Sequence, residues 1–429
     1  MRNIHLYLGV ILFLLTPTCL WAGEPLSLED CFKAALKRSE VLATQQELVV
    51  QAEENYHRAW GAILPTINSS YSYFHQHAPG LTSSGNTQSS TGQQTLKIMA
   101  DQPLFRGFRD FAALNVTKNF ITAQEQARQW AGMQLYRDVA QAFYTCLAVQ
   151  KDLHVLDNEL DLYQKRIKEL QDRLTIGRSR ITEVLTVQAA QAILKAQREQ
   201  VLGQLEVTKE VLAFLTGLDQ DIQLDDTDEV PFEIGSLDSY QSEINVRPDI
   251  MAARKNLEAF KSNISVAKGA YLPSVDLIGN YYVERPDLQK NGAWDVELAV
   301  TLPIFTGGII SSNVKTAESQ KRQSEIQLSQ VQRLAQEEIR SLHHNLKADL
   351  AQLAALQEAF NISEKNYKAN AKDYEFNLVT NLDVLQALTA YEDTERSLEK
   401  IRYLSKVDYN KLEAATAHRL SLMEGLEKR

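Results

Sequence analysis

Residues 135–174 read LYRDVAQAFYTCLAVQKDLHVLDNELDLYQKRIKELQDRL. Along this segment, apolar side chains recur in alternating steps of four and three residues: Leu135, Val139, Ala142, Cys146, Val149, Leu153, Leu156, Leu160, Tyr163, Ile167, Leu170 and Leu174. An unbroken period of 3.5 residues predicts a helix in a left-handed coiled coil, because ordinary globular helices follow a period of 3.6. Cys146 lies in this frame, so its small thiol is expected to be buried and reduced.

The helix that carries this pattern is expected to be very long. The helical pattern extends over about 109–176, which at ~1.5 Å per residue corresponds to about 100 Å. Gly177 follows it, and glycine tolerates the left-handed backbone of a tight reversal. A returning helix is predicted over 182–215, so the whole segment forms a helical hairpin.

A second hairpin is predicted about 200 residues further along. At that shift Pro103, Phe105, Gly107, Leu153, Leu156, Val184, Leu185, Glu199, Val207, Leu212 and Thr216 recur as Pro303, Phe305, Gly307, Leu353, Leu356, Val384, Leu385, Glu399, Val407, Leu412 and Thr416. Dispersed matches at one shift indicate a duplication. Helices are therefore predicted over 309–376 and 382–416, with Asn377 at the reversal. The second heptad frame contains polar residues such as Asp349 and Asn370, so the seam along this frame is expected either to be wetter than the first or to pack against a different neighbour.

Each half opens with a further predicted helix, over 26–63 and over 248–271. Both helices stop before a Leu-Pro pair, because proline disfavours helical backbone in the preceding residue. The period then changes to two, which predicts strands in the regions 66–104 and 273–303. The alternating apolar residues are Ile67, Tyr71, Tyr73, Leu96, Ile98, Ala100, Val296, Leu298, Val300 and Leu302.

Two polar segments, 79–94 and 285–292, separate the predicted strands within each region. The first is rich in Gly, Ser, Thr and Gln, and the second contains Pro286 and Gly292. Both segments are typical of exposed loops that connect hairpins. The predicted class is mainly α with β: long coiled-coil hairpins plus four strands, in a two-fold internal repeat.

The N-terminus has the pattern of a signal peptide over residues 1–22, with Arg2, an apolar core from Ile4 to Leu15, and Ala22 at the cleavage point. Cys19 leaves a lipoprotein as an alternative, although Thr18 is a poor residue before a lipidated cysteine. The predicted layout then continues with repeat 1 at 23–217, an acidic linker or equatorial element at 218–246, and repeat 2 at 247–429.

Composition narrows the function. The 429 residues carry a net charge of -10 without a basic block, which argues against nucleic acid as a partner. After the first residues, no stretch offers the ~20 apolar residues of a membrane helix, so a membrane-spanning protein would need strands in a closed barrel. The four strands of one chain cannot close a barrel. Two copies of the chain would contribute eight strands to a shared barrel, and three copies would contribute twelve. The alternative is the edge of a soluble sandwich.

Several motifs together resemble the TolC-like outer-membrane efflux proteins. They are LSLEDCF at 26–32, the Leu-Pro pair before each hairpin, PLFRG at 103–107 with PIFTGG at 303–308, and DVL at 383–385. Their order, doubling and spacing are more specific than any single motif, and they cover nearly the whole mature chain.

This resemblance implies a homotrimer with a twelve-strand barrel in the outer-membrane lipid and a helical tunnel across the periplasm. It also implies docking of a periplasmic adaptor protein and an inner-membrane transporter, in a tripartite efflux pump or a type I secretion system. It implies no enzymatic activity and no cofactor. Neither the cargo nor the type of pump is indicated by a cluster of aromatic or charged residues.

Two rival functions come from other classes. A periplasmic coiled-coil adaptor would carry one hairpin and a lipoyl-like domain rather than two hairpins at a shift of 200 residues. A surface coiled-coil structural protein would lack the Leu-Pro strand entries. No catalytic, cofactor or metal residues are predicted: His343 and His344 point in different directions on a helix and are expected to be a solvated pair.

The functional residues are expected at the two reversals between long helices. The adaptor-docking tips are predicted around Gly177, Arg178 and Arg180 in the first reversal and around Asn377 and Thr380 in the second. The alternative is that the arginines only keep the tip soluble.

A pore gate is predicted at Asp383 and Glu183, which occupy the same position in the two repeats. In the resembling family an acid before Val-Leu narrows the closed entrance, and Asp383 matches it. The resembling family has a second acidic residue three positions further on, where this chain has Gln386. The family also has an arginine that latches the closed state, and this chain has Val379 near that position. The alternative is that Thr380 and Asp383, which have capping-box spacing, only cap the helix.

Overall fold

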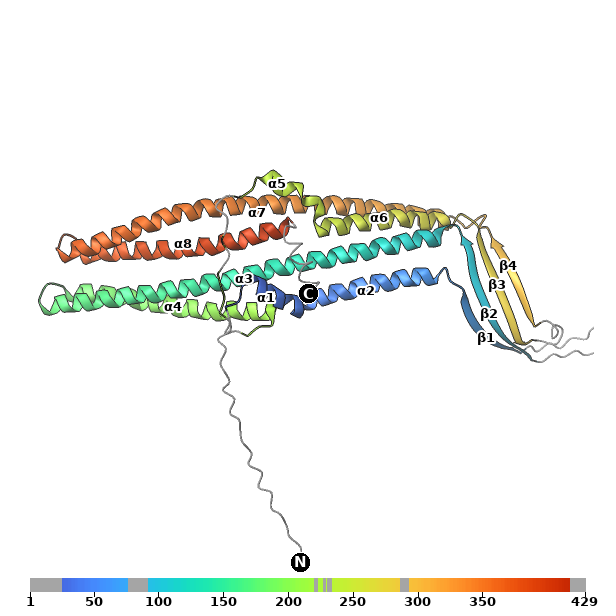
Figure 1. Ribbon diagram of the computed structural model, residues 1–429, viewed down its shortest axis with the longest axis horizontal. Helices are drawn as coiled ribbons and strands as arrows, with labels where there is room; N and C mark the ends of the chain where they lie inside the picture. The colour runs from blue at the N-terminus through green and yellow to red at the C-terminus, as the bar shows by residue number, and fades with distance from the viewer. Residues whose placement is uncertain are drawn as a thin grey trace, which may run out of the picture.

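The computed structural model describes residues 25–75, 92–219, 223–226, 229, 234–285 and 293–416. Within these residues, two long helical hairpins lie side by side and one four-stranded sheet extends from their far end (Figure 1). The predicted signal peptide, Cys19 and nearly all of both predicted loops lie outside the described residues.

The long helices are α3 (Arg109–Thr175) and α7 (Ile309–Glu375), each of 67 residues. At ~1.5 Å per residue each is about 100 Å long, as expected from the heptad pattern. They return as α4 (Ile181–Thr216) and α8 (Asn381–Ala415). The reversals contain Gly177 with φ 72° and Asn377 with φ 58°, so both residues adopt the predicted left-handed backbone.

The seam of α3 is buried as its heptad predicts. Val139, Leu156 and Leu170 are all fully buried, and Cys146 is 1 % exposed. Cys146 forms no disulfide, and burial raises the pKa of its thiol, so the expected buried and reduced cysteine is confirmed. The seam of α7 is buried only as far as Asp349 and then stays half-buried until Tyr374, so within one chain it is more exposed than the seam of α3, which agrees with both expected alternatives.

The predicted single helix at 26–63 is wrong, because the structure contains α1 (Leu28–Arg38) and α2 (Glu40–Gly61). Ser39 separates them with ψ 112°, and its hydroxyl accepts a hydrogen bond from the Leu42 amide at 3.3 Å. A serine at an N-cap satisfies an otherwise unpaired amide, which favours a new start over continuation. The second opening helix, α6 (Pro248–Gly269), is unbroken.

The sheet joins the two halves of the chain. Its strands β1 (Thr66–Phe74), β2 (Gln93–Arg106), β3 (Ser274–Glu284) and β4 (Trp294–Thr301) are antiparallel in sequence order. Register pairs Ile67 with Ala100, Ala100 with Gly279, and Gly279 with Val296. The central pairing of β2 with β3 therefore connects the predicted hairpins into one sheet, and β1 and β4 are its edges.

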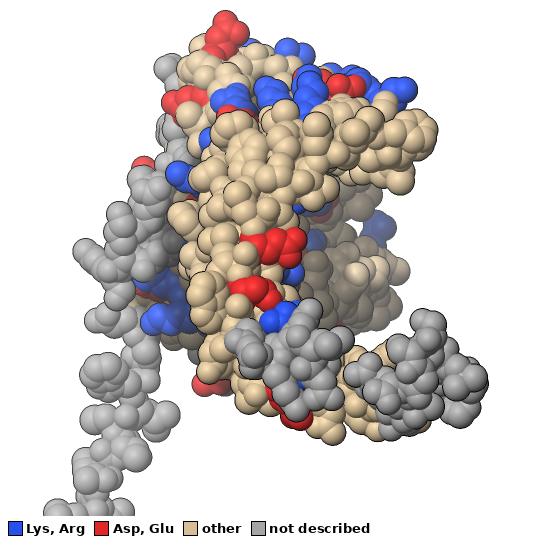
Figure 2. Space-filling view, turned by 90° about the vertical axis from the view of Figure 1, so that its right-hand side faces the viewer, with Lys and Arg blue, Asp and Glu red and all other residues tan. Residues whose placement is uncertain are grey.

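The two faces of this sheet differ, because paired residues share a face. One face carries the apolar residues predicted from the alternation, including Ile67, Val296 and Leu298, which are 60–72 % exposed. The other face is polar: Asn280 accepts a hydrogen bond from Lys97 at 3.0 Å and donates one to Asp295 at 2.8 Å. Uncharged residues cover much of this end of the molecule (Figure 2).

The predicted linker at 218–246 contains small elements of its own, α5 (Leu237–Ser242) and the 3₁₀ helix η1 (Ile244–Val246). Tyr240 and Ile244 pack with Ile339 of α7 in one core cluster. This packing corrects the expectation of a solvated His343–His344 pair. His343 is 8 % exposed, its ring lies against Tyr240, and its Nε2 is 3.0 Å from the carbonyl of Gly235.

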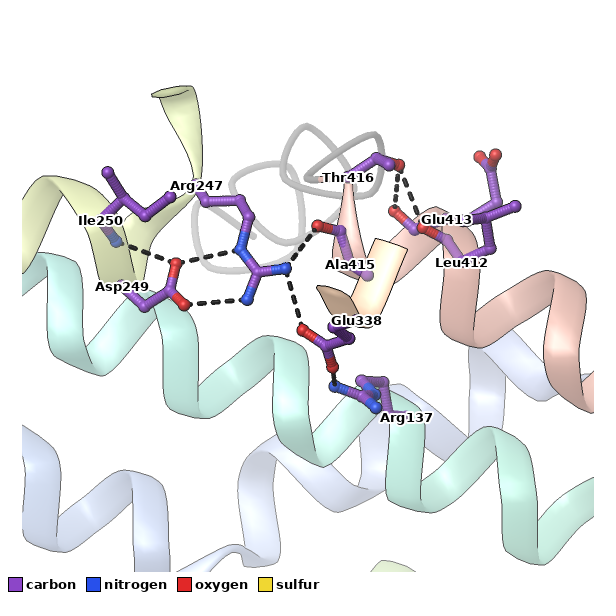
Figure 3. A network of polar contacts seen from close by, with 9 residues as sticks. All are labelled: Arg137, Arg247, Asp249, Ile250, Glu338, Leu412, Glu413, Ala415 and Thr416. Carbon is purple, nitrogen blue, oxygen red and sulfur yellow. Dashed lines mark hydrogen bonds and ion pairs between the residues drawn. The ribbon is translucent and has the colours of Figure 1, made fainter. Parts of the chain in front are cut away.

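A buried arginine connects this region to the long helices (Figure 3). Arg247, just before α6, is 2 % exposed and donates two hydrogen bonds to Asp249, at 2.8 and 3.1 Å. It also donates to Glu338 of α7 at 2.9 Å and to the carbonyl of Ala415, at the end of α8, at 3.0 Å. Arg137 of α3 reaches the other oxygen of Glu338 at 2.5 Å. The chain of contacts from Arg247 through Glu338 to Arg137 therefore connects segments from both halves.

None of the described helices combines the length and the apolar character that crossing a membrane requires.

Candidate functional site: the helical tips

The two tips have the same backbone geometry. In the first, the Gly177 amide bonds to Leu174 O at 3.0 Å and the Arg178 amide to Arg173 O at 2.8 Å. In the second, Asn377 and Leu378 make the corresponding bonds at 3.0 Å each. This pattern satisfies the last carbonyls of α3 and α7 and requires a left-handed residue, which explains the Gly and the Asn.

The residues predicted at the tips are on the surface. Arg178, Arg180, Asn377 and Thr380 are all exposed, as is Gly177. Sequence reasoning missed the apolar side chains that surround them, Ile176, Ile181, Phe376, Leu378 and Leu382, which are 54–73 % exposed. They lie outside the heptad frames, and exposed apolar residues clustered at a tip are typical of a contact surface.

Asp383 forms the capping box that its spacing predicts. Its Oδ2 accepts hydrogen bonds from the Thr380 amide at 2.7 Å and the Thr380 hydroxyl at 2.6 Å. The Thr380 hydroxyl in turn accepts from the Asp383 amide at 3.3 Å. The hydrogen bond from the Thr380 hydroxyl lowers the pKa of Asp383, and that from the amide adds to the effect. The carboxylate is therefore charged at neutral pH.

Glu183 is held in a similar way at the start of α4. Its Oε2 accepts hydrogen bonds from the Ser179 hydroxyl at 2.6 Å and from the Arg180 amide at 3.4 Å. Among the residues that the structure describes, no hydrogen bond joins Glu183 to Asp383. Each acid is thus anchored to its own helix start.

A contact that sequence reasoning missed joins the two hairpins just behind the tips. Arg166 of α3 is 9 % exposed and donates two hydrogen bonds to the side-chain oxygen of Asn381, at 2.8 and 3.0 Å. The ring of Tyr374 lies between Arg166, at 3.9 Å, and Arg173, at 4.4 Å. Such stacking on a desolvated ring adds a cation–π attraction. No sequence signal identified it, because its partners are about 200 residues apart.

Among the residues that the structure describes, no group of three or more His, Cys, Asp or Glu side chains is arranged to hold a metal ion. The site consists of charged and apolar contact residues around two helix reversals.

Two long helical hairpins with exposed tips, joined to an edge-open sheet with one apolar face, define the structural class as a paired helical-hairpin fold with an attached sheet. The chain belongs to the outer membrane efflux protein family, whose sequence profile matches residues 32–218 and 239–418. The resemblance inferred from the motifs is therefore confirmed.

Individual relatives are distant. The chain is 26 % identical over 313 residues to the cation efflux system protein CusC of Escherichia coli K12, an alignment that covers 68 % of this chain and 65 % of CusC. It is 27 % identical over 302 residues to the outer membrane protein TolC of Vibrio cholerae, covering 66 % of this chain and 68 % of TolC. The chain thus spans just under two thirds of the length of CusC.

The fold agrees with solved structures over a larger span. The outer membrane protein VceC of Vibrio cholerae superposes with a TM-score of 0.76 at 20 % identity, covering 91 % of this chain and 95 % of that one. This likeness establishes the fold.

Proposed function

We propose that this protein is a subunit of an outer-membrane channel that exports solutes across the periplasm and the outer membrane, in a tripartite efflux pump or a type I secretion system. The observation that carries the proposal is the four-stranded sheet, open at both edges, at the end of helices about 100 Å long. Unpaired strand edges beside an apolar face are stable in lipid only when other strands close the sheet.

The proposed assembly is a homotrimer with a twelve-strand barrel, in which the apolar face contacts outer-membrane lipid and the polar face lines the pore. A groove in the helical region supports association of copies. It is lined by apolar residues that include Val41, Phe214 and Leu334, which are 58–78 % exposed in a single chain. A second copy would remove this surface from water, which is the main driving force of association.

The proposed layout follows the repeats at 23–217 and 247–429, with 218–246 as an equatorial element. The tips would lie in the periplasm, where they would dock an adaptor protein coupled to an inner-membrane transporter. The proposed role is conduction, without enzymatic activity or a cofactor. The pore gate would be a ring of Asp383 side chains, with Glu183 at the equivalent position of the other hairpin.

Asp383→Asn should reduce the cation selectivity of the channel in planar bilayers by a few-fold and weaken block by multivalent cations. The reason is that a ring of charged carboxylates raises the local concentration of cations. Thr380→Val is the matched control, because it removes the capping hydroxyl and leaves the charge. Failure of the wild type to conduct would overturn the channel itself. Unchanged selectivity with a lower melting temperature would reduce Asp383 to a helix cap.

Arg178→Glu should reduce crosslinking of the tip to a periplasmic adaptor protein several-fold, because it reverses an exposed charge at the proposed contact surface. Lys168→Glu, at another exposed site of the same helical hairpin, is the control. Crosslinking efficiency and drug resistance in cells would be measured together. Normal values of both would show that the arginine only keeps the tip soluble.

A further inference from the structure

The contact between α3 and α8 buries two carboxyl groups away from the tips. Glu159 of α3 is 3 % exposed and Glu392 of α8 is 5 % exposed. In each, Oε1 is shielded from solvent and has no hydrogen-bond partner among the described residues. A carboxylate that lacks both water and partners is strongly disfavoured relative to the neutral acid. The geometry therefore favours protonated side chains.

Acidic groups dominate the surroundings of the pair. The titratable and charged groups near it are Lys151, Asp152, His154, Asp157 and Tyr163 on α3, Arg198 on α4, Glu364 and Tyr367 on α7, and Tyr391, Asp393, Glu395, Arg396 and Glu399 on α8. Arg396 donates two hydrogen bonds to Asp152, at 2.7 and 3.1 Å, and Arg198 donates to Asp157 at 2.7 Å. Both guanidinium groups are thus already paired, and acids outnumber bases around the site.

The titration of both groups follows from this burial. Burial, followed by the charge of Glu159, raises the pKa of Glu392 to about 8. Burial raises the pKa of Glu159 to about 7, with Arg396 opposing the shift. Tyr163 lies in hydrogen-bond contact with Glu392 and lowers its pKa only in part.

We propose that Glu159 and Glu392 form a proton-binding site that holds α3 against α8, and that release of its proton to water loosens the contact between the two hairpins. Two protonated carboxyl groups can stay buried at this contact without repulsion, whereas two buried carboxylates repel one another.

The direction of the pH dependence follows from the raised pKa values. The folded protein binds more protons at these positions than the unfolded chain, whose glutamates titrate near 4.5. The stability of the contact is therefore complete below pH 4.5 and is lost as the pH rises through about 7 to 8. If the chain is the proposed channel, alkaline pH should favour separation of the hairpins behind the tips.

The first test is an infrared titration of the intact oligomer in detergent. The wild type should show the carbonyl band of a buried carboxylic acid, lost with a midpoint between pH 7 and 8. Glu159→Gln and Glu392→Gln should each diminish this band, and the exposed neighbour Asp393→Asn should retain it. If the wild-type band were lost near pH 4.5, the ordinary pKa of a glutamate, this result alone would overturn the proposal.

The second test measures the separation of the hairpins directly. Spin labels on Lys165→Cys of α3 and Gln386→Cys of α8, both exposed positions, would report the distance in labelled chains diluted with unlabelled ones. The distance distribution should shift to longer values from about pH 6 to about pH 9 in the wild-type background. The shift should disappear in Glu159→Gln/Glu392→Gln, which mimics the protonated pair. An unchanged wild-type distribution would refute the loosening.

Conductance of the same samples separates this inference from the proposed function. A pH-dependent distance shift in a protein that does not conduct would keep the proton site and reject the channel. Conduction without a distance shift would keep the channel and reject the proton site.

Discussion

Arg247→Met should lower the free energy of unfolding by about 3–5 kcal/mol, because it removes the cation from a buried ion-pair network, leaves Asp249 without its cationic partner and leaves Glu338 with Arg137 alone. Arg247 is 2 % exposed at the side chain, while Asp249 and Glu338 are 18 % and 24 % exposed. The substitution also removes the donor to Ala415 O and the guanidinium 4.5 Å from the ring of Trp130. Denaturant unfolding of the purified protein, followed by circular dichroism, measures the loss.

The control for this experiment is Arg198→Met. Arg198 forms an equally short ion pair with Asp157, at 2.7 Å, but the side chains are 30 % and 50 % exposed. Water screens such a pair, so the expected loss is below about 1 kcal/mol. Equal losses in the two variants would show that Arg247 contributes no more than a surface charge.

The length and core of the helical hairpins were predictable from local patterns. The heptad frame from Leu135 to Leu174 identified the seam of α3, and the Gly and Asn at 177 and 377 identified both reversals. The Thr380–Asp383 capping box was also predictable, because its two partners lie three residues apart and their geometry depends only on the start of one helix.

Features that depend on distant segments were not predictable. The Arg166–Asn381 contact joins residues 215 positions apart, and nothing in either neighbourhood identifies its partner. His343 was expected in solvent because His343 and His344 point in different directions on their helix and have no third metal ligand, yet Tyr240 of α5 packs against His343. The prediction of one continuous helix across Ser39 was wrong for another reason. The apolar pattern continues across Ser39, and only the helix cap at this residue shows that a new helix begins. Tertiary packing decided the first two cases, and a local helix cap decided the third.

Gly107→Ala should destabilise the protein by more than about 4 kcal/mol, the range reached when a backbone clash cannot relax. Gly107 lies between β2 and α3 with φ 63°. An added Cβ would lie 2.2 Å from the carbonyl oxygen of Gly269 and 2.9 Å from Cβ of Leu272. Both neighbours belong to the end of α6 and the turn after it, so relief of the clash requires the sheet to move relative to the helices.

Gly307→Ala provides a matched control, because Gly307 occupies the equivalent position of the second half. It has the same φ of 63°, but within the chain no atom lies within 4 Å of its Cβ position. This variant should therefore show only the left-handed backbone strain, about 1–2 kcal/mol.

The difference between the two variants is measured by the fraction of each that migrates as an oligomer in detergent gels without heating, together with its melting temperature. Equal defects would mean that backbone conformation alone requires glycine at both positions. A larger defect for Gly107→Ala would show that the close approach of α6 to the β2–α3 junction determines the orientation of the sheet relative to the helices.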